Sequence, residues 1–262
     1  AEIGTAKINY ELDGQGAETI VLLNGIMMST GSWEDFVEPI TASGYQLLRV
    51  DFRDQGKSSY CQEQYGLELQ VDDLKALFDQ LELGKIHLAG ISYGGMVALL
   101  FAREYQEQLA SLMLFNTPAR ASRRLQKISD SWEAAARLKD PATFAQLSFP
   151  HIYSDDFYDR HGDWLEERVA GLGEVLTDEW LEGFIRLSVS GKHFDIEDDL
   201  EQIQLPTLLV AGDQDTIIPV ADMEVLKEKL PNSQMMVFKD CGHASCYESQ
   251  TEFLTSLLGF AD

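Results

Sequence analysis

Short apolar runs alternate with amphipathic segments along the first half of the chain, and the alternation resumes near its end. The apolar runs are typical of strands buried on both faces and span 20–23, 45–50, 86–89, 112–115, 205–211 and 234–238. Apolar residues at helical spacing predict helices over 33–42, 67–83, 96–105, 220–230 and 249–260. Strands that alternate with helices form βαβ units, so we expect an α/β fold with a mostly parallel, doubly wound sheet. The alternating stretch 7–12 predicts an edge hairpin strand.

The pattern changes between residues 118 and 200. No β-branched run occurs there, and Trp, Phe, Tyr, Asp and Glu recur at helix-like spacings. We therefore expect a helical cap, or lid, over 118–200, inserted into one catalytic core made of 1–117 and 201–262. Aromatic residues of the cap could line a cleft, although at helical spacing they more often pack in a core; they are Phe144, Phe149, Tyr153, Phe157, Tyr158 and Trp164.

Length and cysteine content limit the classes of protein to consider. A folded chain of 29.4 kDa exposes about 11,500 Å² and buries enough surface for one large core without disulfide or metal staples. The three cysteines show no metal-ligand spacing, and we expect neither a metal nor an organic cofactor. No apolar run reaches the roughly 18 residues of a membrane span, and no basic and apolar leader opens the sequence. We expect a cytoplasmic protein, or else a mature secreted one.

The charge balance is strongly acidic. The sequence has 20 Lys and Arg against 44 Asp and Glu, for a net charge of −24, and 15 of the acids fall between Asp155 and Glu201. Such a field repels phosphate backbones and anionic lipids, which argues against nucleic-acid binding and membrane docking. The one basic cluster, residues 120–127, is interpreted as a solvated helix face or as a docking site for an anionic substrate or carrier.

The strongest local motif is Gly90-Ile-Ser92-Tyr-Gly94, which follows a predicted strand and precedes a predicted helix. This is the G-x-S-x-G nucleophile elbow in the context it requires. Small flanking residues permit the tight turn that exposes the serine above the sheet. We expect Ser92 to be a catalytic nucleophile.

A serine hydroxyl needs a general base, and His243 is the best placed of the five histidines. It lies after the last strand, at the same edge of a doubly wound sheet as the elbow. The order Ser, acid, His predicts the third member in Gly212-Asp-Gln-Asp215. Asp215 is the first choice and Asp213 the fallback. Asn116, not an acid, follows the preceding strand of the sheet.

These motifs, together with Asn24-Gly-Ile26, Asp51 to Ser58 and Gly242-His243, resemble the α/β-hydrolase superfamily over essentially the whole chain. The resemblance implies an oxyanion hole made by the backbone N–H groups of Ile26 and Tyr93. It also implies a structural role for Arg53. Relatives usually have His-Gly where this chain has Asn24-Gly25, and we expect Asn24 to hydrogen-bond the loop in place of that histidine. Met27, Met28 and Trp33 could line an acyl pocket.

The residues and the resemblance predict a serine hydrolase of the esterase type. It would cleave small-molecule carboxylic esters, and also lactones or enol-lactones, through an acyl-enzyme. The acidic surface should favour neutral or cationic esters over anionic ones. Two alternatives remain open: an acyltransferase that moves an acyl chain from a thioester carrier to an alcohol, and a non-enzymatic receptor on the same scaffold. The sequence does not predict an oligomeric state.

Overall fold

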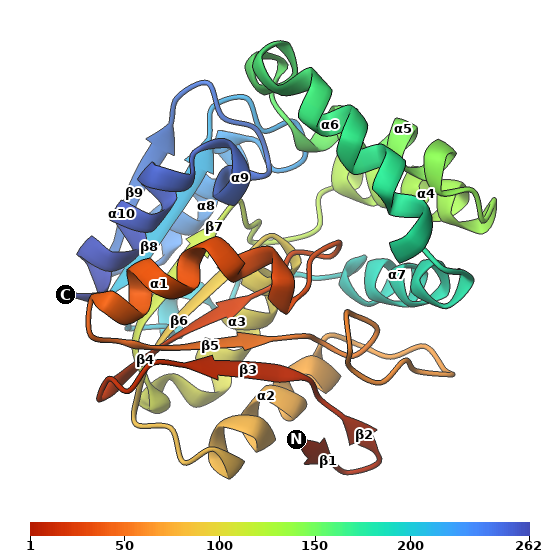
Figure 1. Ribbon diagram of the computed structural model, residues 1–262. Coiled ribbons are helices and arrows are strands. Elements are labelled where there is room, and N and C mark those ends of the chain that lie inside the picture. Colours follow the sequence, from red (N-terminus) through yellow and green to blue (C-terminus); the bar gives the residue numbers. More distant parts are fainter.

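The computed structural model describes residues 1–262 and contains nine strands (Figure 1). Their bounds are β1 Glu2–Ile3, β2 Ala6–Lys7, β3 Tyr10–Asp13, β4 Glu18–Leu23, β5 Gln46–Val50, β6 Lys85–Ile91, β7 Leu109–Phe115, β8 Thr207–Gly212 and β9 Ser233–Phe238. Strands β3 to β9 form one sheet in the order β3-β5-β4-β6-β7-β8-β9, and only the β3–β5 pair is antiparallel. The predicted mostly parallel sheet is confirmed.

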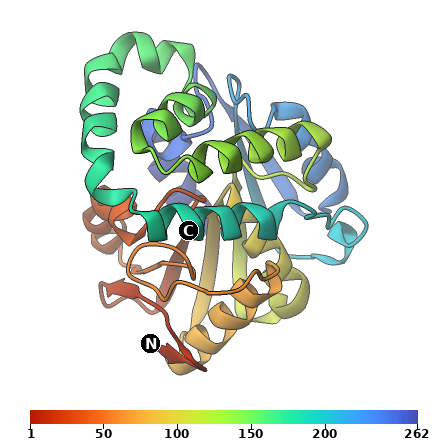
Figure 2. The same cartoon turned by 90° about the vertical axis from the view of Figure 1, so that its right-hand side faces the viewer.

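Helices cover both faces of this sheet (Figures 1 and 2). Ile20 and Leu22 of β4 share a core with Phe36 and Phe253 on one face, while Val21 of β4 belongs to a larger core on the other. The first core is covered by α1 Glu34–Ala42 and α10 Gln250–Ala261, the second by α2 Glu68–Gln80, α3 Tyr93–Tyr105 and α8 Val220–Lys229. The predicted helix 249–260 corresponds to α10, and the short α9, Ser245–Glu248, lies before it and was not predicted. The folded chain exposes 11,529 Å², close to the area expected from its mass.

The prediction of an edge hairpin over residues 7–12 is wrong about which strand pairs with the edge strand. The stretch 7–12 is divided between β2 and β3, and β3 pairs antiparallel with β5 instead of with the next strand along the chain. The chain must therefore cross the start of β5 on its way to β4. Gly14 has φ +81°, and a side chain at Gly16 would collide with the Gly44 carbonyl, so this crossing requires glycine.

Four helices lie between β7 and β8 in the sequence: α4 Arg123–Arg137, α5 Pro141–Ile152, α6 Asp155–Val175 and α7 Asp178–Gly191. Figures 1 and 2 show them as one group over one end of the sheet strands. The segments leading into and out of this group pair with each other, because Ala121 N–H donates to Phe194 O and Ile196 N–H to Ala119 O. No helix in the structure is long and apolar enough to cross a membrane.

Candidate active site

Ser92 lies at a sharp turn between β6 and α3. Its backbone has φ 54° and ψ −114°, and α3 starts at Tyr93, three residues before the predicted start. A side chain at Gly90 would collide with the Gly94 carbonyl, and one at Gly94 would meet the Leu23 carbonyl at 2.5 Å. Both glycines are therefore needed for the strand and helix to approach so closely, which gives the strained nucleophile-elbow geometry.

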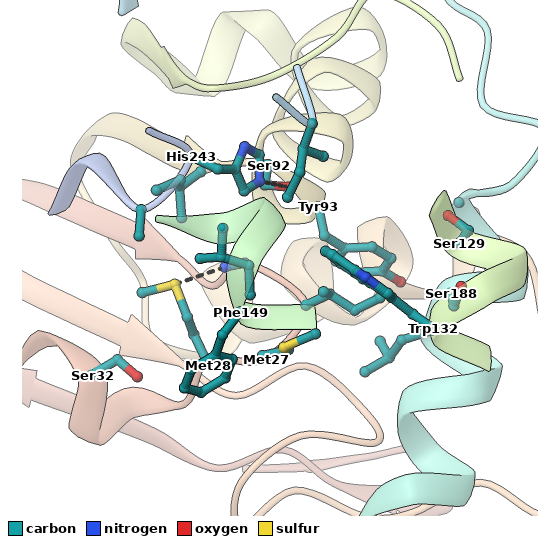
Figure 3. A pocket seen from close by; sticks show the side chains of 18 of the residues that line it. Met27, Met28, Ser32, Ser92, Tyr93, Ser129, Trp132, Phe149, Ser188 and His243 are labelled. Atoms are coloured by element: carbon teal, nitrogen blue, oxygen red, sulfur yellow. Dashed lines mark hydrogen bonds between the residues drawn. The ribbon is translucent and has the colours of Figure 1, made fainter. Parts of the chain in front are cut away.

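The structure brings Ser92, His243 and Asp215 into one line of hydrogen bonds. Figure 3 shows the bond between His243 and Ser92. His243 Nε2 lies 2.9 Å from Ser92 Oγ, and His243 Nδ1 lies 2.7 Å from Asp215 Oδ2. His243 as a whole residue is 9% exposed, and Asp215 is 5% exposed. A base within hydrogen-bonding distance of a hydroxyl, itself oriented by a carboxylate, is the arrangement of nucleophilic catalysis.

The Asp215 carboxylate is held by three further N–H donors. Its Oδ1 accepts from the backbone amides of Ile217 and Ile218, both at 2.8 Å, and its Oδ2 accepts from Asn116 Nδ2 at 2.9 Å. The fallback, Asp213, instead accepts from the Cys241 amide at 3.2 Å. In the sequence, Asn116 is notable only because it stands where an acidic residue could have been. Its amide contact with Asp215 depends on how the chain crosses between two strands, which no local motif reveals.

The loop that carries His243 is fixed from two sides. The amides of His243 and Ala244 donate to the carbonyl of Ile152 at the end of α5. Glu248 accepts from the amides of Gly242 and Ala244, and also from that of Ser154. The helices between β7 and β8 therefore contact the histidine loop directly. Sequence reasoning missed Glu248, and nothing in its spacing singles it out among 44 acids.

A buried amide network supports the loop of Ile26. Asn24 Nδ2 donates to Val50 O at 2.8 Å and to Gln55 Oε1 at 3.2 Å, while Asn24 Oδ1 accepts from the Trp33 indole. Gln55 Nε2 then donates to Gly25 O at 2.9 Å and to Ile26 O. These bonds fix the carbonyls of the loop, whereas the Ile26 amide has no acceptor in the protein. Tyr93 begins a helix, where backbone amides lack intrahelical partners.

A cavity of about 360 Å³ opens beside Ser92, and 22 of its 34 lining residues are hydrophobic. Met27 and Met28 line it, together with Phe144, Phe149 and Tyr153 of the predicted cap aromatics. Figure 3 shows Met27, Met28 and Phe149 around the cavity. Trp33 does not line it, contrary to expectation, because its indole is buried with Phe36 and Phe253 and bonded to Asn24. The other three predicted aromatics, Phe157, Tyr158 and Trp164, also lie outside the lining.

Two ion pairs brace the segment from Asp51 to Ser58. Arg53 makes two bonds to Asp73 of α2, at 2.5 and 2.7 Å, in agreement with a structural role. Asp54, which has φ 66°, binds Arg186 of α7 with its closest contact at 2.7 Å. The second pair therefore ties α7 to this segment. The four basic side chains at 120–127 are exposed and do not line the cavity. The neutral residues Ala121, Leu125 and Gln126 of the same stretch do line it.

Burial keeps two thiols and one tyrosine hydroxyl near the nucleophile protonated. It raises the pKa of the Cys241 thiol to about 12 and also raises the pKa of the Cys246 thiol, which lines the cavity. It likewise raises the pKa of the Tyr93 hydroxyl, which lies 2.9 Å from Ser190 Oγ. No group of three or more His, Cys, Asp or Glu side chains is arranged to hold a metal ion.

Comparison with known proteins places the chain among hydrolases. A family model described as serine aminopeptidase, S33, matches residues 14–250. A 2-hydroxy-6-oxononadienedioate/2-hydroxy-6-oxononatrienedioate hydrolase of Escherichia coli K12 is 27% identical, over 98% of this chain and 91% of its own.

Solved structures agree. An α/β-hydrolase enzyme from a Medee basin deep-sea metagenome library is 36% identical, with a TM-score of 0.96 over 100% of this chain and 96% of its own. A thermophilic esterase from Thermogutta terrifontis is 26% identical, with a TM-score of 0.85 over 98% and 93%. The α/β-hydrolase resemblance is thus confirmed, and the chain belongs to the serine aminopeptidase S33 family within the α/β-hydrolase superfamily, a family of hydrolytic enzymes.

Proposed function

We propose that the protein is a carboxylic-ester hydrolase that forms an acyl-enzyme on Ser92. The observation that carries the proposal is the continuous line of hydrogen bonds from Ser92 through His243 to Asp215, at the wall of a mainly apolar cavity. An esterase among the solved relatives supports the choice of substrate class. Lactones and enol-lactones are included, because opening their ring is the same acyl transfer.

In the first step, Ser92 Oγ attacks the acyl carbonyl carbon and His243 Nε2 takes its proton. The carbonyl π electrons move to the oxygen, which the backbone N–H groups of Ile26 and Tyr93 stabilise. Asp215 holds the imidazole in the tautomer that leaves Nε2 free and stabilises the imidazolium. The tetrahedral intermediate collapses, the alkoxide leaves with the proton from His243, and the acyl group remains on Ser92.

In the second step, water attacks the acyl-enzyme. His243 takes a proton from this water, and the oxyanion forms again between Ile26 and Tyr93. Collapse of the intermediate breaks the bond to Ser92 Oγ, which recovers its proton from His243. The products are one carboxylic acid and one alcohol, and the enzyme is unchanged. The protonated thiols of Cys241 and Cys246 do not compete with Ser92 as nucleophiles.

We further propose that residues 118–200 act as a cap on a catalytic core formed by 1–117 and 201–262. Residues of α4 to α7 make up a large part of the cavity lining, and the carbonyl of Ile152 fixes the histidine loop. In this arrangement the cap both shapes the acyl site and supports the base. Substrate choice therefore depends on the cap, while the core supplies the chemistry.

Product analysis tests the proposal. We expect p-nitrophenyl esters of a chain-length series to be turned over at about 1–10³ s⁻¹ at the preferred length. The free acid should be the only acyl product, even when an alcohol or hydroxy acid is added as an acceptor. Chromatography of the reaction measures both products.

The same experiment separates the alternatives. An acyl group found mainly on the added acceptor, with an acyl-carrier thioester as donor, would establish an acyltransferase instead. Binding of esters without turnover at any chain length would favour a receptor. Of the four exposed basic residues at 120–127, Arg120 pairs with Glu197 and Lys127 with Asp130, which leaves Arg123 and Arg124 for an acidic carrier.

A further inference from the structure

Two cationic side chains line the cavity, and they differ in one respect. The ammonium of Lys192, at the end of α7, is paired with Asp130 at 2.5 Å and Glu133 at 3.3 Å. Arg168, on α6, has no acidic side chain within ion-pairing distance. In a chain with 44 acidic residues and only 20 basic ones, a cation left unpaired inside the active cavity requires an explanation.

The guanidinium of Arg168 is held by aromatic rings. Its central carbon lies 5.2 Å from the centroid of the Trp164 ring and 5.1 Å from that of Tyr247. Contacts of this kind hold the cation through the ring faces and leave the N–H groups at its edge free to donate. The planar fork of N–H groups matches the two oxygens of a carboxylate.

The surroundings of Arg168 supply neutral donors and no competing acid. Tyr247 and Ser32 also line the cavity, and Figure 3 shows Ser32 beyond Met28, on the opposite side of the view from Trp132. Burial raises the pKa of the Tyr247 hydroxyl, so that it stays protonated and able to donate. Glu248, on the neighbouring α9, has its carboxylate bonded to backbone amides of the histidine loop.

We propose that Arg168 is a specificity-determining residue that binds a carboxylate of the substrate, remote from the bond that is cleaved. The inference rests on the proposed ester hydrolysis and names its substrate class: esters or lactones that carry a free carboxylate on the same small molecule. It reverses the expectation that the acidic chain prefers neutral esters. Surface charges act weakly beyond the Debye length of about 8 Å at physiological salt, whereas Arg168 contacts the ligand directly.

Isosteric esters test the proposal. The acyl series consists of monoethyl succinate, monoethyl glutarate and monoethyl adipate. Each is compared with an ethyl ester of the same length in which a methyl ketone replaces the free carboxyl group. In the alcohol series, acetate esters of hydroxy acids are compared with those of the matching hydroxy ketones. At the best length in one series, we expect kcat/KM of the carboxylate ester to exceed that of its ketone by roughly 10- to 100-fold, the contribution of a charged hydrogen-bonded pair.

Variants assign the preference to the residue. R168Q should remove it, mainly through KM, because the contact is remote from the reacting bond and is made in both ground and transition states. R168K should restore part of it. R160Q is the matched control: Arg160 is an exposed arginine of the same helix, paired with Asp156 and outside the cavity lining, so its loss changes the net charge equally but should leave the preference intact.

The outcomes are distinct from those of the proposed function. Hydrolysis of the ketone esters at least as fast as of the carboxylate esters, at every length in both series, would overturn the role of Arg168 and leave ester hydrolysis standing. An equal loss of preference in R160Q and R168Q would assign it to the overall field and would also overturn the role. If the wild-type protein hydrolyses no ester in these series or among p-nitrophenyl esters, the proposed function fails and this inference fails with it.

Discussion

Ser92→Ala is expected to lower kcat for p-nitrophenyl ester hydrolysis by about 10⁶-fold. The change removes the nucleophile, whereas the remaining oxyanion donors and substrate binding retain a residual acceleration of about 10³–10⁴ over water. The only side-chain partner of Ser92 is His243, and the elbow is built by the backbone and the flanking glycines. The variant should therefore fold like the wild-type protein, which a thermal melt checks.

Ser131→Ala provides the control for this substitution. Ser131 lies on α4, donates to the carbonyl of Ile128, and neither lines the cavity nor contacts the catalytic residues. The Ser131→Ala protein should have the same activity as the wild-type protein. Full turnover in a folded Ser92→Ala protein would show that the reaction does not pass through this serine.

Asp215→Asn is expected to lower kcat by about 10⁴-fold. An amide that donates to His243 Nδ1 favours the tautomer with the proton on Nε2, which cannot accept the proton of Ser92. The substitution also places an amide next to the Asn116 amide and two backbone N–H donors, which now surround a weaker acceptor. Steady-state kinetics with the preferred ester measure the loss.

Asp213→Asn is the matched control, since it makes the same chemical change two residues away. Asp213 is exposed and accepts only from the Cys241 amide, so we expect less than a threefold effect, roughly the scale of one exposed hydrogen bond. Similar losses in both variants would mean that the acid has not been assigned to the right residue.

The parts of the site that follow from local sequence were predictable. The elbow can be recognised because the glycines on both sides of Ser92 are required by a turn that involves only neighbouring residues. The edge at which His243 and Asp215 lie follows from the parallel sheet, so the sequence predicts their proximity to Ser92.

The parts that depend on tertiary packing were not predictable. Asn116 and Glu248 support the acid and the base across long stretches of chain, and no spacing connects them with their partners. Trp33 follows the loop of Ile26 and could on that ground line the pocket, yet the short 3₁₀ helix Thr30–Trp33 turns its indole into the core beside Asn24. The sequence likewise does not reveal that Arg168 lines the cavity without an acidic partner, because this depends on how distant segments pack.

Mass spectrometry of the acyl-enzyme tests the central claim most directly. The protein is mixed with an excess of a p-nitrophenyl ester, quenched in acid within the first turnovers and digested. We predict that one acyl group is found on the peptide that contains Ser92, and that it is absent from the Ser92→Ala protein. An active protein that carries no acyl group, or carries it on another residue, would contradict the account.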